Sequence, residues 1–151
     1  MFSLCTVFDC REFEDNLNYN CDNVDHELAL MSLKALGNVG GTRNSAQVLS
    51  RCMMNPAVEM ELRVEAVKAF RRIDCDVART DVMTLYQDMT MDSELRIHAY
   101  LQLMKCPSRQ VLVDIKQQMQ SEEINQVSDV SRPRHFVSLV IMIIVYSFTC
   151  G

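Results

Sequence analysis

The sequence contains few of the residues that mark non-globular chains. Only 4 glycines and 3 prolines occur among 151 residues, which excludes collagen-like and low-complexity classes. Tryptophan is absent, whereas hydrophobic residues make up 48% and charged residues 23% of the chain. These fractions are ordinary for a folded domain, and a chain of this length can bury a core of its own.

The chain also lacks the patterns that catalytic and phosphate-binding sites require. Its histidines lie in unrelated contexts without a nucleophile motif: His26, His98 and His135. No glycine-rich loop precedes an expected helix, which excludes a phosphate loop. Glu94 and His98 are one helical turn apart, but two exposed neighbours on a helix explain them better than a shared metal. We therefore expect no enzymatic activity, no cofactor and no metal site.

Positive charge is sparse as well. The formal net charge is −5, whereas a general nucleic-acid binder carries a basic surface, so nucleic acid is not an expected partner. No basic residue precedes Asp9, and a secretory signal peptide begins with basic residues, so we expect no signal peptide.

Charge is missing altogether after His135, and residues 136–148 are apolar except for two serines and one tyrosine. As a helix, about 13 to 15 residues reach about 20–22 Å, against a hydrocarbon core of about 30 Å. Three interpretations of this tail remain open. It is a short membrane anchor flanked by Arg132, Arg134 and His135, a non-native or peripheral hydrophobic end, or a strand with a tendency to aggregate.

The chain does contain an internal repeat. Three gapless segments of ten residues begin at Glu27, Glu61 and Glu94, at offsets of 34 and 33 residues. Apolar residues coincide in four columns, namely Leu28, Leu62 and Leu95; Leu30, Val64 and Ile97; Leu33, Val67 and Tyr100; and Leu36, Phe70 and Leu103. A fifth column holds small residues that would let helices approach closely, namely Ser32, Ala66 and Ala99.

The spacing within each segment is helical, because apolar residues recur at intervals of three and four. Shorter helices are expected between the segments, with these start signals: Asn44 or Ser45, Thr80, and Ser108. Asp92 is the expected cap of the third segment, and Gly37 is the expected C-cap of the first. No strand is expected before residue 136.

These elements predict an all-α chain of three antiparallel helix pairs, at about 26–54, 58–90 and 93–121. A fourth helix is expected to start at Ser121. Such pairs cannot bury their apolar faces alone, so stacking into an α-solenoid is the expected architecture. A compact helical bundle with an accidental repeat is the alternative.

Several segments resemble the large lipid transfer proteins, the family of vitellogenins, insect apolipophorins, apolipoprotein B and microsomal triglyceride transfer protein. The similarity covers about residues 24–127 and is greatest to the apolipophorin branch. It is carried by Ser32-Leu-Lys-Ala-Leu-Gly-Asn-Val-Gly40, Glu61-Leu-Arg-Val-Glu-Ala-Val-Lys-Ala-Phe-Arg-Arg72, Ser93-Glu-Leu-Arg-Ile-His-Ala-Tyr100, Leu103-Met-Lys-Cys-Pro107 and Glu122-Glu-Ile-Asn-Gln-Val127.

The resemblance implies a right-handed superhelix of helix pairs that acts structurally around a lipid cavity, in an extracellular lipid-transport particle. Lipid would then be a partner through the parent assembly. The family's N-terminal barrel and lipid-holding sheets have no counterpart here, so the chain is expected to be a fragment. We expect a non-matching segment 1–23, a helical-repeat domain 24–130 and an apolar tail 131–151.

The resemblance also implies a disulfide between Cys75 and Cys106, which follow the first helices of consecutive repeats. Free thiols in a cytosolic chain are the alternative. Cys5 and Cys10 could bridge or bind a metal, and Cys52 is expected to be a small core residue.

The pairings of five cysteines and the identity of the lipid-binding residues are not predicted; these cysteines are Cys5, Cys10, Cys21, Cys52 and Cys150. A HEAT- or tetratricopeptide-like interaction scaffold, membrane-tethered by the tail and cytosolic, is the alternative function.

Overall fold

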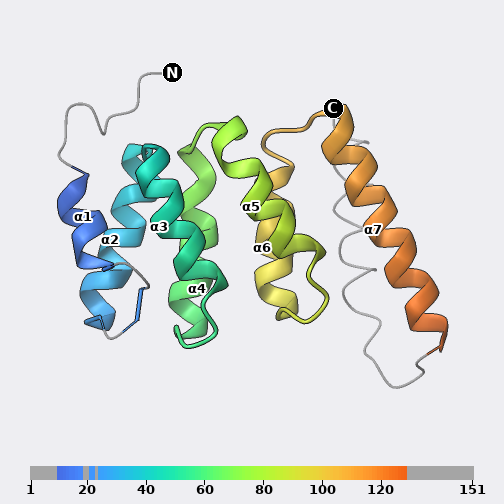
Figure 1. Cartoon of the computed structure of the whole chain (residues 1–151), viewed down its shortest axis with the longest axis horizontal. Helices are drawn as coiled ribbons and strands as arrows, with labels where there is room; N and C mark the ends of the chain where they lie inside the picture. The colour runs from blue at the N-terminus through green and yellow to red at the C-terminus, as the bar shows by residue number, and fades with distance from the viewer. Residues whose placement is uncertain (1–9, 19–20, 23, 129–151) are drawn as a thin grey trace. The chain divides into compact units, whose positions relative to one another are not determined.

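The computed structural model describes residues 10–18, 21–22 and 24–128, and every secondary-structure element in this part of the chain is a helix (Figure 1). The all-α prediction is confirmed. The chain divides into two compact units between Cys106 and Pro107. The helices of the first unit are α1 (Arg11–Asn16), α2 (His26–Val39), α3 (Arg43–Met54), α4 (Met60–Ala69), the 3-10 turn η2 (Phe70–Arg72), α5 (Cys75–Gln87) and α6 (Ser93–Leu103). The second unit contains α7 (Arg109–Ser128).

The first unit has two layers of helices. The first-layer helices α2, α4 and α6 lie next to one another in that order, and the second-layer helices α3 and α5 contact each other (Figure 1). Each second-layer helix packs chiefly on the first-layer helix that follows it, α3 on α4 and α5 on α6. The repeats are therefore joined by contacts between a helix of one repeat and a helix of the next.

The repeat columns supply a large part of the core. Every member of the small-residue column is buried, and so are the two columns that begin with Leu33 and Leu36. Leu62 and Leu95 are buried, whereas the equivalent Leu28 is 45% exposed. This difference arises because, among the described residues, no second-layer helix precedes α2 as α3 precedes α4.

Two of the predicted helix starts are confirmed and two are wrong. Asp92 accepts a hydrogen bond from the N–H of Glu94 (2.8 Å), and Ser108 accepts one from the N–H of Val111 (3.2 Å). Helix α5 begins at Cys75 rather than near Thr80, because Asp74 is the residue whose side chain caps it.

The cap of α3 is Thr42 rather than Asn44 or Ser45. Thr42 accepts from the N–H of Ser45, and the Ser45 hydroxyl accepts from the N–H of Thr42. This is a reciprocal capping box with serine in the third helical position. Asn44 and Ser45 instead donate their side-chain hydrogens to another helix, as described below.

Two predicted helix ends are also wrong. Gly37 lies inside α2, which ends at Gly40, where a φ of 80° suits a residue without Cβ. Helix α7 continues through Ser121 without a break. The Ser121 hydroxyl donates to the carbonyl of Gln118 (2.7 Å), so it satisfies the preceding turn instead of capping a new helix.

Helix α1 closes one end of the described array. It packs on α2, where Asn16 donates to the Ser32 hydroxyl (3.2 Å). The buried carboxylate of Glu14 accepts hydrogen bonds from Asn44 and from Ser45, in the first turn of α3. A negative charge at this position also suits the positive end of the α3 dipole.

Replacing Glu14 with alanine is expected to lower the free energy of unfolding by about 1–3 kcal/mol, because Ser45 and Asn44 lose a buried acceptor. Chemical denaturation followed by circular dichroism measures the change. Glu12→Ala is the matched control, since Glu12 is exposed on the same helix. Equal effects of the two substitutions would contradict this assignment.

Two sequence predictions fall outside the described residues: the apolar tail and the bridging of Cys5. Within the described part of the chain, no helix has the length and apolar character needed to cross a membrane.

Candidate functional site

Two buried arginines join consecutive repeats. Arg63 and Arg96 occupy the same repeat column, and they are only 7% and 6% exposed. The Arg63 Nε donates to the backbone carbonyl of Met53 (3.1 Å), and the Arg96 Nε donates to that of Tyr86 (2.9 Å). Each acceptor lies in the last turn of the preceding second-layer helix. We call these two contacts the arginine joints.

The arginine joints provide hydrogen-bond donors for carbonyl groups at the C-terminal ends of α3 and α5. The last carbonyls of α3 and α5 have no partner in their own helix, and a cation is favoured at this negative end. Secondary contacts hold each guanidinium in place: Arg63 lies 3.3 Å from the Met91 sulfur, and Arg96 lies over the Tyr86 ring at 5.8 Å. Burial lowers the pKa of Arg63 from its ordinary value, while the charge of Asp92 opposes that shift.

Arg71 and Arg72 of η2 bind the end of α2 in a similar way. Arg71 donates to the Lys34 carbonyl (3.3 Å) and to the Asn38 side chain (2.7 Å), and Arg72 donates to the Asn38 carbonyl (2.7 Å). The Arg71 guanidinium lies so close to Gly37 that a Cβ there would clash with it. A side chain at position 37 would therefore displace the Arg71 guanidinium from its present place.

Two disulfides connect neighbouring parts of the first unit. Cys75 and Cys106 are bonded, with their Cα atoms 5.8 Å apart, at the start of α5 and just after α6. This is the pair that the family resemblance implies. Cys21 and Cys52 are also bonded, with a Cα separation of 5.0 Å. Cys52 is fully buried, as the prediction of a small core residue requires, whereas its pairing was left open by the sequence. Cys10 is disulfide-bonded as well.

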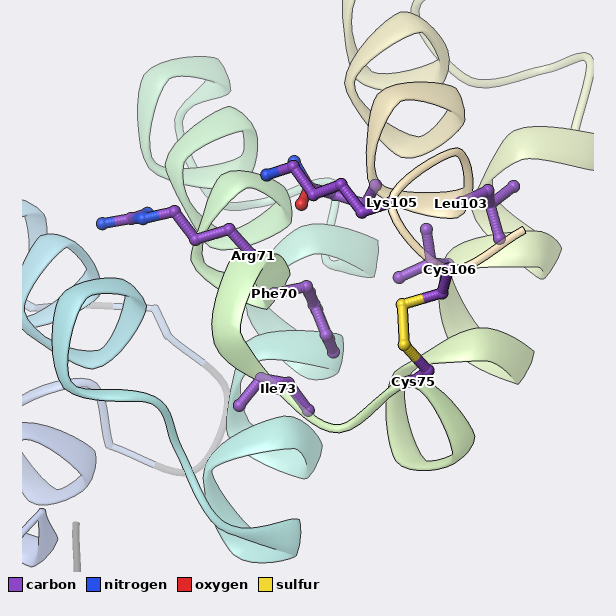
Figure 2. Close-up of a pocket in the computed structure, with 9 residues that line it drawn as sticks. Phe70, Arg71, Ile73, Cys75, Leu103, Lys105 and Cys106 are labelled. Carbon is purple, nitrogen blue, oxygen red and sulfur yellow. A yellow bond between two sulfur atoms is a disulfide. The ribbon is translucent and has the colours of Figure 1, made fainter. Parts of the chain in front are cut away.

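A hollow lies beside the Cys75–Cys106 disulfide (Figure 2). It has about 370 Å³ of space, part of it open to solvent. Its lining residues come from η2, α5, α6 and the segments next to them: Phe70, Arg71, Ile73, Cys75, Val82, Gln102, Leu103, Lys105 and Cys106. Burial, and to a smaller extent the charge of Arg71, lowers the pKa of Lys105.

The described histidines fill structural positions. The His26 ring nitrogens lie 3.1 and 3.3 Å from the carboxylates of Glu59 and Glu61, which brings the first turns of α2 and α4 together. Burial lowers the pKa of His98, and the charge of Lys68 adds to the effect. No group of three His, Cys, Asp or Glu side chains is placed to hold a metal ion within the described residues.

Comparison with known proteins gives one decisive match. The vitellogenin TPR domain family matches residues 6–131, which is most of the chain.

The chain belongs to the vitellogenin TPR domain family.

Several curated proteins are similar to this vitellogenin TPR domain. It is 32% identical to apolipophorins of Drosophila melanogaster over 121 residues, 78% of this chain. It is 30% identical to apolipophorins of Locusta migratoria over 101 residues (66%) and to vitellogenin of Penaeus merguiensis over 105 residues (68%). These matches span 3–4% of the relatives' length. No solved structure gives a significant match.

The relationship to apolipophorins and vitellogenin confirms the resemblance seen in the sequence. The family match begins at residue 6 and so includes most of segment 1–23. Within that segment, α1 packs on α2 and Cys21 is bonded to Cys52. Neither the arginine joints nor the Cys21–Cys52 bridge was predicted from the sequence. The shared Glu-Leu-Arg at Glu61 and Glu94 was the available signal for the joints.

Proposed function

We propose that this vitellogenin TPR domain serves lipid transport as a structural part of an extracellular lipoprotein, where its helical repeats surround a lipid cavity formed by other parts of the assembly. The helical-repeat domain of this proposal is residues 24–130, between an N-terminal segment 1–23 and an apolar tail 131–151. The family match over residues 6–131 carries the proposal.

The construction of the first unit supports a structural function. Its polar contacts connect neighbouring helices: the two buried arginine joints, the exposed η2 contacts with α2, and the hydrogen bonds of the buried Glu14 with α3. Two disulfides add covalent ties, which persist in oxidising extracellular fluid but are rare in the cytosol. These features produce a stiff array, as a wall around a lipid store requires.

A chimera tests this proposal. Residues 6–131 replace the matching region of Drosophila melanogaster apolipophorins, and the protein is expressed for secretion in insect cells. We expect secreted particles whose buoyant density and lipid content equal those of the parent. The matched control is the same chimera with Arg63→Ala and Arg96→Ala, which is expected to be retained because the joints are broken.

Protease resistance of the grafted region separates the outcomes. Secreted particles that carry a folded graft but little lipid would contradict the proposal. If the folded chain instead captures peptides while the chimera stays poor in lipid, the interaction scaffold is the better function.

A further inference from the structure

The sulfur of Met91 makes a contact that the structural function proposed above does not require. Met91 lies in the segment that connects α5 with α6, and it is partly exposed to solvent. Its sulfur lies 3.3 Å from a terminal nitrogen of Arg63, the buried guanidinium of one arginine joint. Both residues belong to the first unit, so the contact is part of one compact body.

A turn fixes the position of Met91. The Met91 N–H donates to the carbonyl of Asp88 (3.2 Å). The Asp88 carboxylate accepts from both the N–H (2.9 Å) and the hydroxyl (2.6 Å) of Thr90. These bonds lower the pKa of Asp88, so its carboxylate stays ionised in mild acid and keeps the turn closed.

The Arg63 guanidinium is a strong donor that faces a weak acceptor. Its Nε donates to the Met53 carbonyl (3.1 Å), and within the described part of the chain the Met91 sulfur is the acceptor for its terminal nitrogens. A thioether sulfur accepts hydrogen bonds weakly, whereas a bond from a cation to an oxygen is stronger. An oxygen on this sulfur would improve the contact. A sulfoxide is also neutral, so it would not repel Asp92, whose charge acts on the same guanidinium.

We propose that Met91 is an oxidation site, at which hydrogen peroxide converts the thioether to a sulfoxide whose oxygen accepts a hydrogen bond from Arg63. The sulfur lone pair attacks one peroxide oxygen, so an S–O bond forms while the O–O bond breaks. The other oxygen takes the proton of the transferred one and leaves as water. The sulfur is thereby oxidised by two electrons and the peroxide is reduced. Methionine sulfoxide reductases reverse this kind of oxidation.

The direction of the effect distinguishes Met91 from an ordinary methionine. Oxidation usually disrupts packing, because it makes an apolar side chain polar. At Met91 the new oxygen meets a buried cation, and a flexible, partly exposed side chain lets the sulfur withdraw to make room for it. Oxidation therefore strengthens the joint at Arg63 and ties the turn before α6 to α4. This site does not rest on the lipid-transport function proposed above.

The order of oxidation tests whether peroxide reaches this sulfur. The full chain is purified with its disulfides formed, its free thiols are blocked with N-ethylmaleimide, and it is treated with hydrogen peroxide for increasing times. Peptide mass spectrometry measures the sulfoxide at each methionine. We expect Met31, which is 66% exposed, to react first, Met91 next and the fully buried Met53 last. Reaction of Met91 no earlier than Met53 would overturn the proposal.

Met91→Leu tests the effect on stability, because leucine has a similar volume and cannot form a sulfoxide. Met89→Leu is the matched control, since Met89 lies in the same connecting segment and is 40% exposed. Urea denaturation before and after peroxide gives the change in the folded-to-unfolded ratio. We expect this change to be about fivefold more favourable in the parent than in Met91→Leu, because a hydrogen bond from a charged donor replaces the sulfur contact. Met89→Leu is expected to respond as the parent does, and equal responses of the parent and Met91→Leu would overturn the proposal.

Nuclear magnetic resonance of the arginine side chains identifies the donor. After peroxide treatment of the parent, we expect the terminal N–H signals of Arg63 to shift downfield and to exchange more slowly with water. In Met91→Leu these signals are expected to be unaffected by peroxide. A general change in packing would not produce this difference. Oxidised Met91 with unchanged Arg63 signals would show that the sulfoxide does not bond to Arg63, which would overturn the proposal.

Discussion

Loss of the Cys21–Cys52 or the Cys75–Cys106 disulfide is expected to lower the free energy of unfolding by about 3–4 kcal/mol. Each bridge closes a loop with a sequence separation of 31 residues, and the chain-entropy model gives this value for a loop of that length. A domain of ordinary stability unfolds with about 5–15 kcal/mol. We therefore expect that the variant lacking both bridges is unfolded or nearly so at body temperature.

The measurement uses Cys→Ser pairs, Cys21→Ser with Cys52→Ser and Cys75→Ser with Cys106→Ser, in chemical denaturation without reductant. In excess reductant, each variant and the parent are expected to have the same stability, which provides the internal control. Peptide mapping after alkylation identifies the bridges directly. Alkylation of all four thiols in unreduced, secreted protein would contradict both pairings.

Replacing Arg63 or Arg96 with alanine is expected to cost about 2–3 kcal/mol. Each substitution removes a charged hydrogen bond and leaves a buried helix-end carbonyl without a partner, and an orphaned buried acceptor costs about 1–3 kcal/mol. Burial of the guanidinium, which lowers the pKa of Arg63, offsets part of the gain in the native protein. A methionine at either position keeps the apolar packing of the stem, so its cost is expected to be smaller.

The control for the arginine joints is Arg43→Ala. Arg43 is exposed at the start of α3. Among the described residues, it makes no contact like those of Arg63 and Arg96. We expect it to change stability by less than about 0.5 kcal/mol. Urea denaturation followed by circular dichroism measures all the variants. If Arg63→Ala and Arg96→Ala matched Arg43→Ala, the joints would contribute nothing to stability.

The helical class was predictable because periodicity is a local property. Leu33, Val67 and Tyr100 recur at one place in each segment, and all three are buried. Helix starts were less predictable, since several residues near α3 can cap a helix. Thr42 caps α3, and Glu14, 31 residues before Ser45, accepts the side-chain hydrogens of Asn44 and Ser45. Only the folded structure brings the Glu14 carboxylate to the first turn of α3.

The candidate sites likewise include one feature that the sequence predicted and others that only the fold shows. The Cys75–Cys106 pair was expected because family resemblance supplied it, whereas the Cys21–Cys52 pair had no such guide. Cys21 lies in the loop before α2 with a φ of 61°, held by a hydrogen bond from its N–H to Asn18 (2.8 Å). The arginine joints were missed because a buried arginine needs an acceptor, and the acceptors lie ten residues earlier, on another helix.

The arginine joints have a consequence for how such an array can change in length. Because Arg63 and Arg96 make equivalent contacts with the helices before them, removal of residues 61–93 would place Glu94-Leu-Arg96 where Glu61-Leu-Arg63 stands now. The shortened array would keep an arginine for the end of α3. Cys75 would be lost, however, and Cys106 would be left without its present partner. Because the arginine joints are equivalent, one repeat can take the place of another. A disulfide, in contrast, forms only when both of its cysteines are kept in the chain.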